Sequence, residues 1–425
     1  MFTVIRSFPI PWYTGSIMNI GINASFLRKP GTGIGQVAVN FLQQLTGYYV
    51  SGSTYQGNAQ YTIPDTRYIL YTEEPINFPL PSNFEVKSFL PRWWKRDDLV
   101  RKILWEKQVA REAEKDGCDV FLSLYQSSTV FPASHITHHA SSVKKHTMVV
   151  HDIIPRLFPE YRGNMRQALY WQRVERGILM ADHIVAISEH TKSDLVRELD
   201  IPAEKITVAS LDVAPRFSRA ISPETVADVL KKYDLRSGYI YHGGGLEVRK
   251  NAETLLRAYA LLCAKKQESG IRNQENTVLP PLVISGKIFP TTNRLATDVA
   301  GLIRELHLEE HVKLLGFVPD EDLPALYKGA LFFVYPSLYE GFGLPVLEAL
   351  RMGVPVLASN TSSLQEIGGE AALYVDPKNI KEMALQMERL LADRMLCESL
   401  IARSASQAVQ FSWSSFVEKT LAVLE

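Results

Sequence analysis

Two carboxylates stand beside a glycine-rich turn in residues 338–359, which read LYEGFGLPVLEALRMGVPVLAS. Glu340 comes directly before the turn, and Glu348 lies among the apolar residues that follow it. An ionised carboxylate only accepts hydrogen bonds, so two of them are suited to hold the hydroxyl groups of a ligand. Burying a carboxylate that has no partner is costly, which favours a functional reason for both. The simpler alternative is that both are helix-start carboxylates satisfied by the helix dipole.

The residues around these carboxylates predict a strand, a turn and a helix. Gly341 and Gly343 form the turn, while Pro345 suits the first position of a helix and Gly353 suits its end. The backbone N–H groups of residues 341–344 then face a ligand, with about half a positive charge behind them. Such an arrangement can bind a phosphate. A phosphate with hydroxyl groups on either side describes a nucleotide sugar.

A second glycine-rich turn lies near the start of the chain. Residues 31–35, GTGIG, join a predicted strand at 18–25 to a predicted helix that Gly47 would close. Glycine lets the backbone N–H groups approach a ligand at the start of a helix. A tight turn without a ligand is an equally good interpretation of so short a pattern.

The acidic run DED at residues 320–322 resembles a metal-binding DxD sequence. It directly precedes a predicted helix, however, and aspartate is a common residue at the start of helices. We therefore interpret it as a helix cap and expect no metal site.

Strand-like and helix-like segments alternate along the chain, which predicts parallel sheets covered by helices on both faces. The first series of predicted strands is 18–25, 67–72, 118–125, 147–152, 183–188 and 205–210, with helices at 98–115, 163–180 and 190–199. The second series is 238–244, 281–286, 312–317, 331–336 and 354–359, with helices at 251–267, 291–306, 321–329 and 344–352.

This alternation divides the chain into two α/β domains of the doubly wound, Rossmann-like kind. The predicted bounds are an extension at 1–17, an N-terminal domain at 18–212, a linker at 213–236, a C-terminal domain at 237–408 and a final helix at 409–425. Ligands of such sheets bind beyond the carboxyl ends of the strands, so a cleft between the two domains is expected.

The composition narrows the class of protein. Lys plus Arg equals Asp plus Glu, 46 each among 425 residues, which argues against a general nucleic-acid binder. The three cysteines are far apart, so neither a disulfide framework nor a zinc site is expected. No apolar run approaches the roughly 20 residues that cross a bilayer. The first 17 residues make a poor signal peptide, and we expect a cytoplasmic protein.

Several segments together resemble the retaining, nucleotide-sugar-dependent glycosyltransferases of family four, a group 1 glycosyltransferase family with the GT-B fold. EGFGLPVLEAL resembles their E-x7-E motif, and the wider match includes GTGIG, VVHDIIP, IVAISEHTKSDL, GGGLEVRKN and the closing FSW. The match spans about residues 18–420. The resemblance implies two Rossmann-like domains facing each other across a cleft, with a C-terminal helix crossing back to the first domain. The N-terminal domain would take the acceptor and the C-terminal domain the donor.

The resemblance also implies roles for single residues. Glu340 would contact the donor sugar near the reacting carbon and Glu348 the ribose hydroxyls, while Lys250 and Arg249 would neutralise the diphosphate. Many members carry an arginine where this chain has Gly245, which places the second positive charge in doubt.

Histidines that match His151 hydrogen-bond the donor sugar in similar enzymes, although a lone histidine at a strand end is slightly more often structural. Asp152 could orient its ring. GFVP, residues 316–319, resembles the segment whose backbone reads the base. The candidate catalytic residues are Glu340 and His151. The candidate donor-binding residues are Gly33, Gly35, Arg249, Lys250, Phe317, Val318, Gly341, Phe342, Gly343, Leu344 and Glu348.

Trp93 and Trp94 lie beside Lys95 and Arg96. The pair would suit a membrane interface or an acceptor glycan, and a pair packed in the core is the plainer alternative.

We therefore expect a hexosyltransferase that moves a sugar from GDP-mannose or UDP-glucose to a glycan or lipid-linked acceptor in polysaccharide biosynthesis. No cofactor, metal or nucleic acid is expected, and a peripheral contact with the inner face of a membrane stays open. A sugar-nucleotide epimerase of similar shape and a non-catalytic sugar-binding protein are the alternatives.

Overall fold

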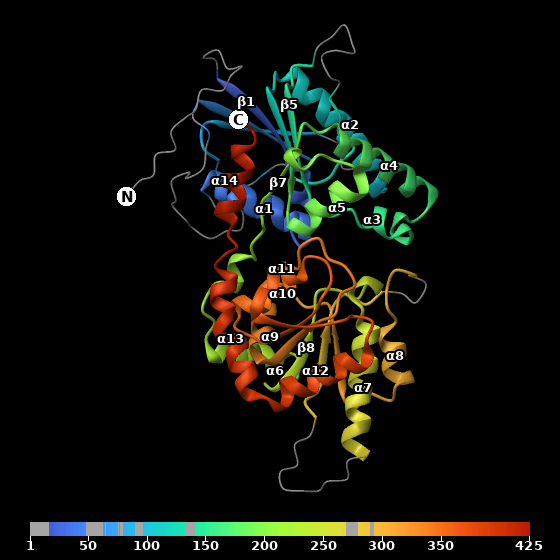
Figure 1. Ribbon diagram of the computed structural model, residues 1–425. Coiled ribbons are helices and arrows are strands. Elements are labelled where there is room, and N and C mark those ends of the chain that lie inside the picture. The colour runs from blue at the N-terminus through green and yellow to red at the C-terminus, as the bar shows by residue number, and fades with distance from the viewer. Residues whose placement is uncertain are drawn as a thin grey trace. The chain divides into compact units, whose positions relative to one another are not determined.

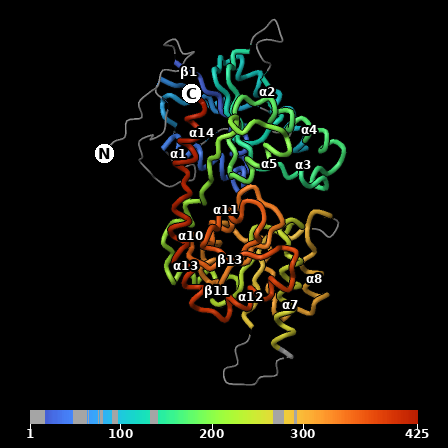
Figure 2. The backbone as a smooth tube through the Cα atoms, in the orientation of Figure 1, coloured from blue at the N-terminus to red at the C-terminus, as the bar shows by residue number. Residues whose placement is uncertain are grey.

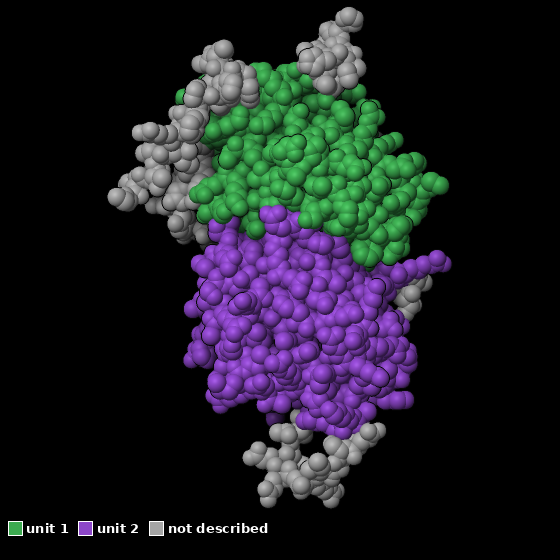
Figure 3. Space-filling model, in the orientation of Figure 1, with its two compact units in different colours: residues 1–187, 192–210, 413–425 green, residues 188–191, 211–412 purple. Residues whose placement is uncertain are grey.

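The computed structural model describes residues 17–47, 63, 65–74, 76, 80–89, 97–131, 141–268, 279–289 and 293–425. The chain forms two compact units (Figure 3). Unit 1 comprises residues 1–187, 192–210 and 413–425, and unit 2 comprises residues 188–191 and 211–412. The extension predicted at 1–17, except for residue 17, and the Trp93–Trp94 segment lie outside the described residues.

Unit 1 is built on a seven-stranded sheet in the order β3-β2-β1-β4-β5-β6-β7 (Figure 1). All of its described strand pairs are parallel. Its strands are β1 Met18–Asn23, β2 Thr66–Thr72, β3 Phe84–Ser88, β4 Val120–Ser123, β5 Lys145–Val150, β6 His183–Ala186 and β7 Ile206–Val208. Its helices are α1 Gly33–Thr46, α2 Asp98–Lys115, α3 Ile154–Leu157, α4 Met165–Met180, α5 Glu189–Leu199, of which residues 189–191 count with unit 2, and α14 Trp413–Ala422.

Unit 2 repeats this plan with a six-stranded parallel sheet in the order β10-β9-β8-β11-β12-β13. Its strands are β8 Tyr239–His242, β9 Leu282–Ser285, β10 Val312–Gly316, β11 Ala330–Tyr335, β12 Val356–Ser359 and β13 Ala372–Val375. Its helices are α6 Pro223–Lys232, α7 Ala252–Glu268, α8 Val299–Glu305, α9 Leu323–Gly329, α10 Leu344–Arg351, α11 Leu364–Gly368, α12 Ile380–Ala392 and α13 Arg394–Ala408.

The strands are apolar because both faces of each sheet are covered. In β1 and β8 nearly every side chain is buried, and helix faces pack against them. The core of unit 2 joins residues of α7 and α12 to the sheet, while separate clusters in unit 1 lie around Trp105 and around Val174. These rigid sheets fix the loops at their carboxyl ends.

The end of the chain returns to unit 1. Figure 2 shows α14 beside α1, and Phe416 of α14 lies 6.1 Å from Phe41 of α1 between ring centroids. Residues 213–236, predicted as a linker, contain α6, which packs on α9 within unit 2.

Candidate functional site

The candidate site of unit 2 lies beyond the carboxyl ends of β8 and β11. These strands are neighbours, and the connections on either side of them run in opposite directions along the sheet. This is the switch point at which doubly wound sheets bind ligands. The loop after β8 leads through three glycines to the 3-10 helix Val248–Lys250. The loop after β11 leads to Glu340 and then to α10.

Glu340 is the centre of a buried charge cluster. Its Oε1 accepts hydrogen bonds from Lys250 Nζ at 2.7 Å, Ser337 Oγ at 2.7 Å and Tyr335 Oη at 2.9 Å. Its Oε2 lies 2.8 Å from a guanidinium nitrogen of Arg249. Lys250 Nζ also donates to Tyr335 Oη at 2.6 Å. One carboxylate therefore binds both cations that the sequence pointed to.

The electrostatics of this cluster keep Glu340 ionised. Burial alone would raise the pKa of Glu340, but the charges of Lys250 and Arg249 and their hydrogen bonds outweigh it and lower that pKa to about 2. Burial lowers the pKa of Lys250, against the pull of Glu340. Arg249 and Lys250 supply two cations here, which the carboxylates of Glu340 and Glu247 balance.

The turn before α10 contains backbone N–H groups that are open to a ligand. The carbonyl oxygens of Glu340 and Phe342 accept from Ser363 Oγ at 2.9 and 2.6 Å. Within the described part of the chain, no group accepts a hydrogen bond from the N–H groups of residues 341–344. Gly343, with φ of +112°, directly precedes the helix, and Pro345 is its second residue. Open N–H groups at a helix start bind anions.

Glu348 occupies the fifth position of α10. Its Oε2 accepts from Tyr327 Oη of α9 at 2.9 Å. Burial raises the pKa of this half-buried carboxyl to about 7, although Tyr327 and Arg216 pull it down. The first turn of α10 holds no acidic residue, so the alternative that both glutamates are helix-start carboxylates is wrong.

Gly245, at the position where the sequence comparison expected an arginine, has a backbone conformation that favours glycine. Its φ is +113°, a conformation that side chains rarely adopt. A Cβ built on it would lie 3.9 Å from Lys250 and 3.8 Å from Glu247. The second positive charge in this chain stands four residues later, on Arg249.

His151 follows β5 in unit 1 and is buried. Its Nε2 donates to the carbonyl oxygen of Leu124 at 3.0 Å, because a carbonyl can only accept. Burial lowers its pKa to about 4, so the ring is neutral at pH 7. Asp152 accepts from the N–H of Ile154 at 3.0 Å. The sequence did not indicate that the carbonyl oxygen of Leu124 accepts a hydrogen bond from this ring.

Gly33 and Gly35 begin α1 in unit 1, and Gly47 ends this helix with φ of +68°, as predicted. Gly35 has a packing reason, because a Cβ there would lie 1.9 Å from the carbonyl oxygen of Lys29. Nothing lies within 4 Å of a Cβ built on Gly33. Their role in donor binding stays a prediction.

The segment predicted to read the base follows β10. Phe317 is 73% exposed, while Val318 is buried. In the neighbouring DED run, Asp322 precedes α9 but makes no capping hydrogen bond. It accepts instead from Lys232 Nζ and Tyr233 Oη, both at 2.6 Å. Asp322 therefore stands at the cap position, but the prediction that it caps the helix is wrong, because its side chain binds Lys232 and Tyr233 instead. The described residues contain no group of three potential metal ligands.

Sequence reasoning missed three hydroxyl-bearing residues of this site, Tyr327, Tyr335 and Ser337. The signal was present, because Tyr335 ends a predicted strand and Ser337 stands three residues before Glu340. The roles assigned to the candidate residues stay predictions, and the structure adds that Arg249, Lys250, Glu340 and the glycine turn lie together.

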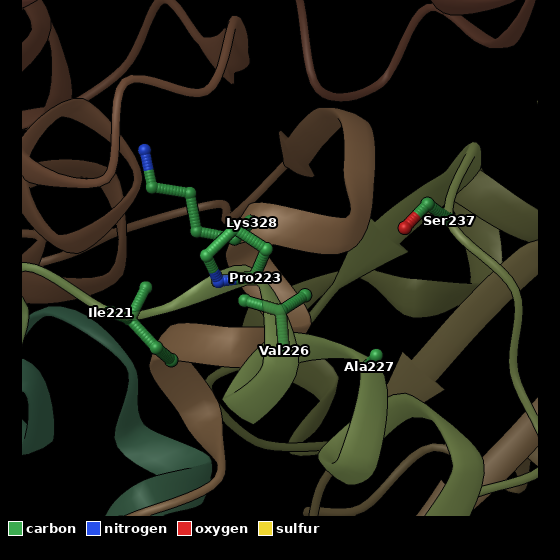
Figure 4. Close-up of a pocket in the computed structure, with 6 residues that line it drawn as sticks. All are labelled: Ile221, Pro223, Val226, Ala227, Ser237 and Lys328. Atoms are coloured by element: carbon green, nitrogen blue, oxygen red, sulfur yellow. The ribbon is translucent and has the colours of Figure 1, made fainter.

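A surface hollow of about 330 Å³ in unit 2 shares no residue with this cluster (Figure 4). Its lining is mostly apolar, with Ser237 and Lys328 as the polar members. Nothing there resembles the charge arrangement around Glu340.

Family models match both halves of the chain. The model described as "Glycosyl transferases group 1" matches residues 232–407, and "Glycosyltransferase Family 4" matches residues 69–210. The O-antigen chain mannosyltransferase B of Escherichia coli is 36% identical over 277 residues, which is 64% of this chain and 68% of that protein. The chain belongs to family four of the group 1 glycosyltransferases. It is therefore a hexosyltransferase, and the epimerase and binding-protein alternatives are not favoured.

Other relatives of this glycosyltransferase are longer or more distant. The serotype-specific mannosyltransferase WbdA of Escherichia coli is 34% identical over 281 residues, but the chain spans only 32% of its length. Anabaena HepE, solved with UDP and glucose, has a TM-score of 0.65 at 17% identity, over 96% of this chain and 99% of that one. WaaG, a glycosyltransferase involved in lipopolysaccharide biosynthesis, has a TM-score of 0.65 at 13% identity, over 95% of this chain and 99% of that one. These structures show the GT-B fold.

None of the described helices is both long enough and apolar enough to cross a bilayer.

Proposed function

We propose that this glycosyltransferase moves mannose from GDP-mannose to a glycan or lipid-linked acceptor in polysaccharide biosynthesis, with retention of configuration. UDP-glucose is the second candidate donor. The observation that carries the proposal is the open glycine turn beside Arg249 and Lys250, which suits a diphosphate. The names of the Escherichia coli relatives, both mannosyltransferases, support mannose over glucose.

The proposed chemistry follows from the charges around Glu340. Departure of the nucleoside diphosphate builds negative charge, which Arg249, Lys250 and the N–H groups of the turn stabilise. Glu340 stays ionised at neutral pH, because its pKa is lowered to about 2. It is then a poor proton acceptor, so the leaving phosphate is the better base for the acceptor hydroxyl. Glu348 would accept from the ribose hydroxyls.

A donor panel tests this proposal. We expect GDP-mannose, among UDP-, GDP- and ADP-sugars, to raise the unfolding temperature most. A ligand at 100 times its dissociation constant adds about 2.7 kcal/mol to the free energy of unfolding. Transfer from the stabilising donor to a mannose-containing glycan should follow, and an equal response to every sugar nucleotide would contradict the assignment.

The variant Lys250→Ala tests whether Lys250 binds the diphosphate of the donor. A hydrogen bond to a charged group is worth about 1.5–3 kcal/mol, so the variant should bind the nucleotide sugar at least tenfold more weakly. Binding of the bare nucleoside should not change. An equal loss for both would mean that the substitution damaged the fold.

A peripheral membrane contact is the second part of the proposal, and α4 supports it. Met165, Leu169 and Met180 are 76, 49 and 41% exposed on this helix, and Arg173 and Arg176 are exposed between them. An apolar and basic helix face is typical of contact with anionic lipids.

Sedimentation with vesicles tests the contact. We expect binding to vesicles that contain anionic lipid and not to neutral ones, and loss of binding in the double variant Arg173→Glu with Arg176→Glu. Lys378→Glu with Lys381→Glu, exposed positions of unit 2, makes the same change in charge and serves as the control. Equal binding by both double variants would contradict the role of α4.

A further inference from the structure

Lys102 of α2 has an unusual environment in unit 1. Its Nζ lies 5.5 Å from the ring centroid of Phe26, 4.9 Å from that of Tyr125 and 5.1 Å from that of Tyr170. No residue that the structure describes forms a hydrogen bond or an ion pair with it. An ammonium group carries three N–H donors, and aromatic faces do not replace hydrogen-bond acceptors.

The nearby carboxylates already have partners of their own. Glu73 pairs with Arg28 at 3.0 Å and with Arg101, and Asp98 pairs with Lys29 at 2.7 Å. These pairs account for three cations and two carboxylates around Lys102.

The third carboxylate, Glu106, lies one helical turn from Lys102 and is 1% exposed. It accepts hydrogen bonds from Tyr170 Oη at 2.7 Å, Tyr125 Oη at 3.3 Å and the N–H of Ser128 at 3.1 Å. Glu106 is thus held by the two tyrosines whose rings face the ammonium group. Among the described residues around this cluster, Lys102 is the cation that forms no ion pair with a carboxylate.

Lys102 and the three rings around it lie at the edge of the sheet where ligands of this kind of fold usually bind. Phe26 follows the carboxyl end of β1, and Tyr125 follows that of β4. β1 and β4 are the neighbours at which the strand order of this sheet reverses, as β8 and β11 are in unit 2. Ligands of doubly wound sheets bind in the crevice at this point.

The pKa of Lys102 is lowered by its surroundings. Burial lowers its pKa, Glu106 raises it, and Arg28 and Lys29 lower it further. An anion close to the ammonium group would favour its charged form.

We infer that Lys102, with the rings of Phe26, Tyr125 and Tyr170, forms a subsite for an oxyanion, a phosphate or a carboxylate, carried by the acceptor. The assignment to the acceptor rests on the proposed transfer reaction, whereas the binding of an oxyanion does not. The three rings restrict the ammonium group to a narrow set of positions, and their edges offer apolar surface to the neighbouring part of the ligand.

Calorimetry with inorganic phosphate and with acetate tests the subsite directly. The protein is the full chain with Lys250→Ala, which weakens the phosphate site of unit 2. We expect the more strongly bound anion to lose at least tenfold in affinity when Lys102→Gln is added, while Lys102→Arg restores most of it. Lys107→Gln, an exposed position of the same helix, is the control and should change nothing. The probe that binds more tightly identifies the class of oxyanion.

Two outcomes would overturn the inference. Equal affinity of Lys102→Gln and Lys107→Gln for both anions would show that the subsite does not exist. A lowered unfolding temperature of Lys102→Gln with unchanged anion affinity would show that the lysine only packs against the rings. Transfer assays then separate the two claims: absence of transfer with every donor counts against the proposed function, whereas a raised acceptor KM with unchanged donor KM in Lys102→Gln places the oxyanion on the acceptor.

Discussion

At the scale of single residues, hydrogen-bond and ion-pair partners determine the pKa values of the two glutamates in unit 2. Glu340 is fully hydrogen-bonded within the protein and joins two cations, whereas Glu348 has one tyrosine partner and a pKa of about 7. The two carboxylates of one motif therefore differ by several pKa units. The first is ionised at neutral pH, and the second titrates close to neutral pH.

Glu340→Gln should separate structure, binding and turnover. Removing the charge leaves Lys250 and Arg249 buried without their counter-ion, so the free energy of unfolding should fall by about 3–5 kcal/mol. The variant should still bind the nucleoside diphosphate, because the cations are then more available, while kcat and kcat/KM fall together. Urea unfolding, calorimetry and initial rates measure the three effects.

Glu247→Gln is the matched control, because its side chain is 40% exposed and lies 3.4 Å from Arg249. An exposed pair contributes about 1 kcal/mol or less. If both variants unfold alike and turn over normally, the cluster around Glu340 has no special role.

Nucleotide-sugar binding should depend on pH through Glu348. Its pKa of about 7 means that the ribose-accepting carboxylate is increasingly protonated below pH 7, so affinity should fall as the pH is lowered. Both phosphates of a nucleotide sugar are diesters and do not titrate there. Calorimetry between pH 5 and 8 should show this dependence in the wild type and not in Glu348→Gln.

In the absence of ligand, the raised pKa of Glu348 predicts that the free energy of unfolding falls with increasing pH, whereas the affinity for the nucleotide sugar rises. The folded chain keeps a proton that the unfolded chain has lost between pH 4.5 and about 7. Stability relative to Glu348→Gln should therefore fall as the pH rises through this window. A flat difference in stability would contradict the raised pKa.

At the scale of elements, the geometry of the site depends on the backbone conformation of the turn that precedes α10. The turn reaches its shape through Gly343, and the same helix ends at Gly353, with φ of +67°. A Cβ on Gly343 would lie 2.6 Å from the Leu364 side chain, whereas on Gly353 it would meet only Lys328 Nζ at 4.0 Å.

Gly343→Ala should therefore cost more than Gly353→Ala. Both place a side chain at positive φ, which costs about 1–3 kcal/mol, but only the first adds a clash with Leu364. We also expect only Gly343→Ala to weaken nucleotide binding, because only this turn presents the open N–H groups. Chemical unfolding and calorimetry on the pair check both points, and equal effects on binding would argue against the turn as the anion site.

At the scale of the whole molecule, the chain uses its last helix to complete its first unit. α14 buries Trp413, Phe416 and Leu421 in unit 1, although more than 200 residues of unit 2 precede it. The stability of unit 1 therefore depends on both ends of the chain.

Phe416→Ala should destabilise unit 1 by about 3–5 kcal/mol, the usual cost of removing a buried phenylalanine. Hydrogen exchange should show lost protection in α1 and unchanged protection in α10. Val409→Ala, at a residue that is 71% exposed, should change neither helix. Equal loss in both units would mean that they unfold as one.

Transfer should also survive chelation. Arg249, Lys250 and the open turn offer positive charge without a metal, so initial rates in EDTA should match those in buffer. Loss of activity that Mg²⁺ or Mn²⁺ restores would contradict this expectation.

The sequence alone predicted most of the secondary structure. The sequence predicts a helix at residues 98–115, and these are the observed bounds of α2. The strand β3 was missed, because FEVKS is short and only partly buried. β13 and the helices α11, α12 and α13 were also not resolved from the sequence.

What the sequence by itself determined was the local chemistry: a strand, a glycine turn, a helix and two carboxylates eight residues apart, because backbone conformation and periodicity depend on near neighbours. Only the tertiary structure decided which groups meet. Lys250 and Glu340 are 90 residues apart, and the parallel pairing of β8 with β11 brings them within 2.7 Å. The same pairing of β1 with β4 brings Tyr125 toward Phe26, at 4.6 Å between ring centroids, where both face Lys102. Long-range pairing, burial and the pKa values that follow from burial depend on the whole fold, and no local pattern contains them.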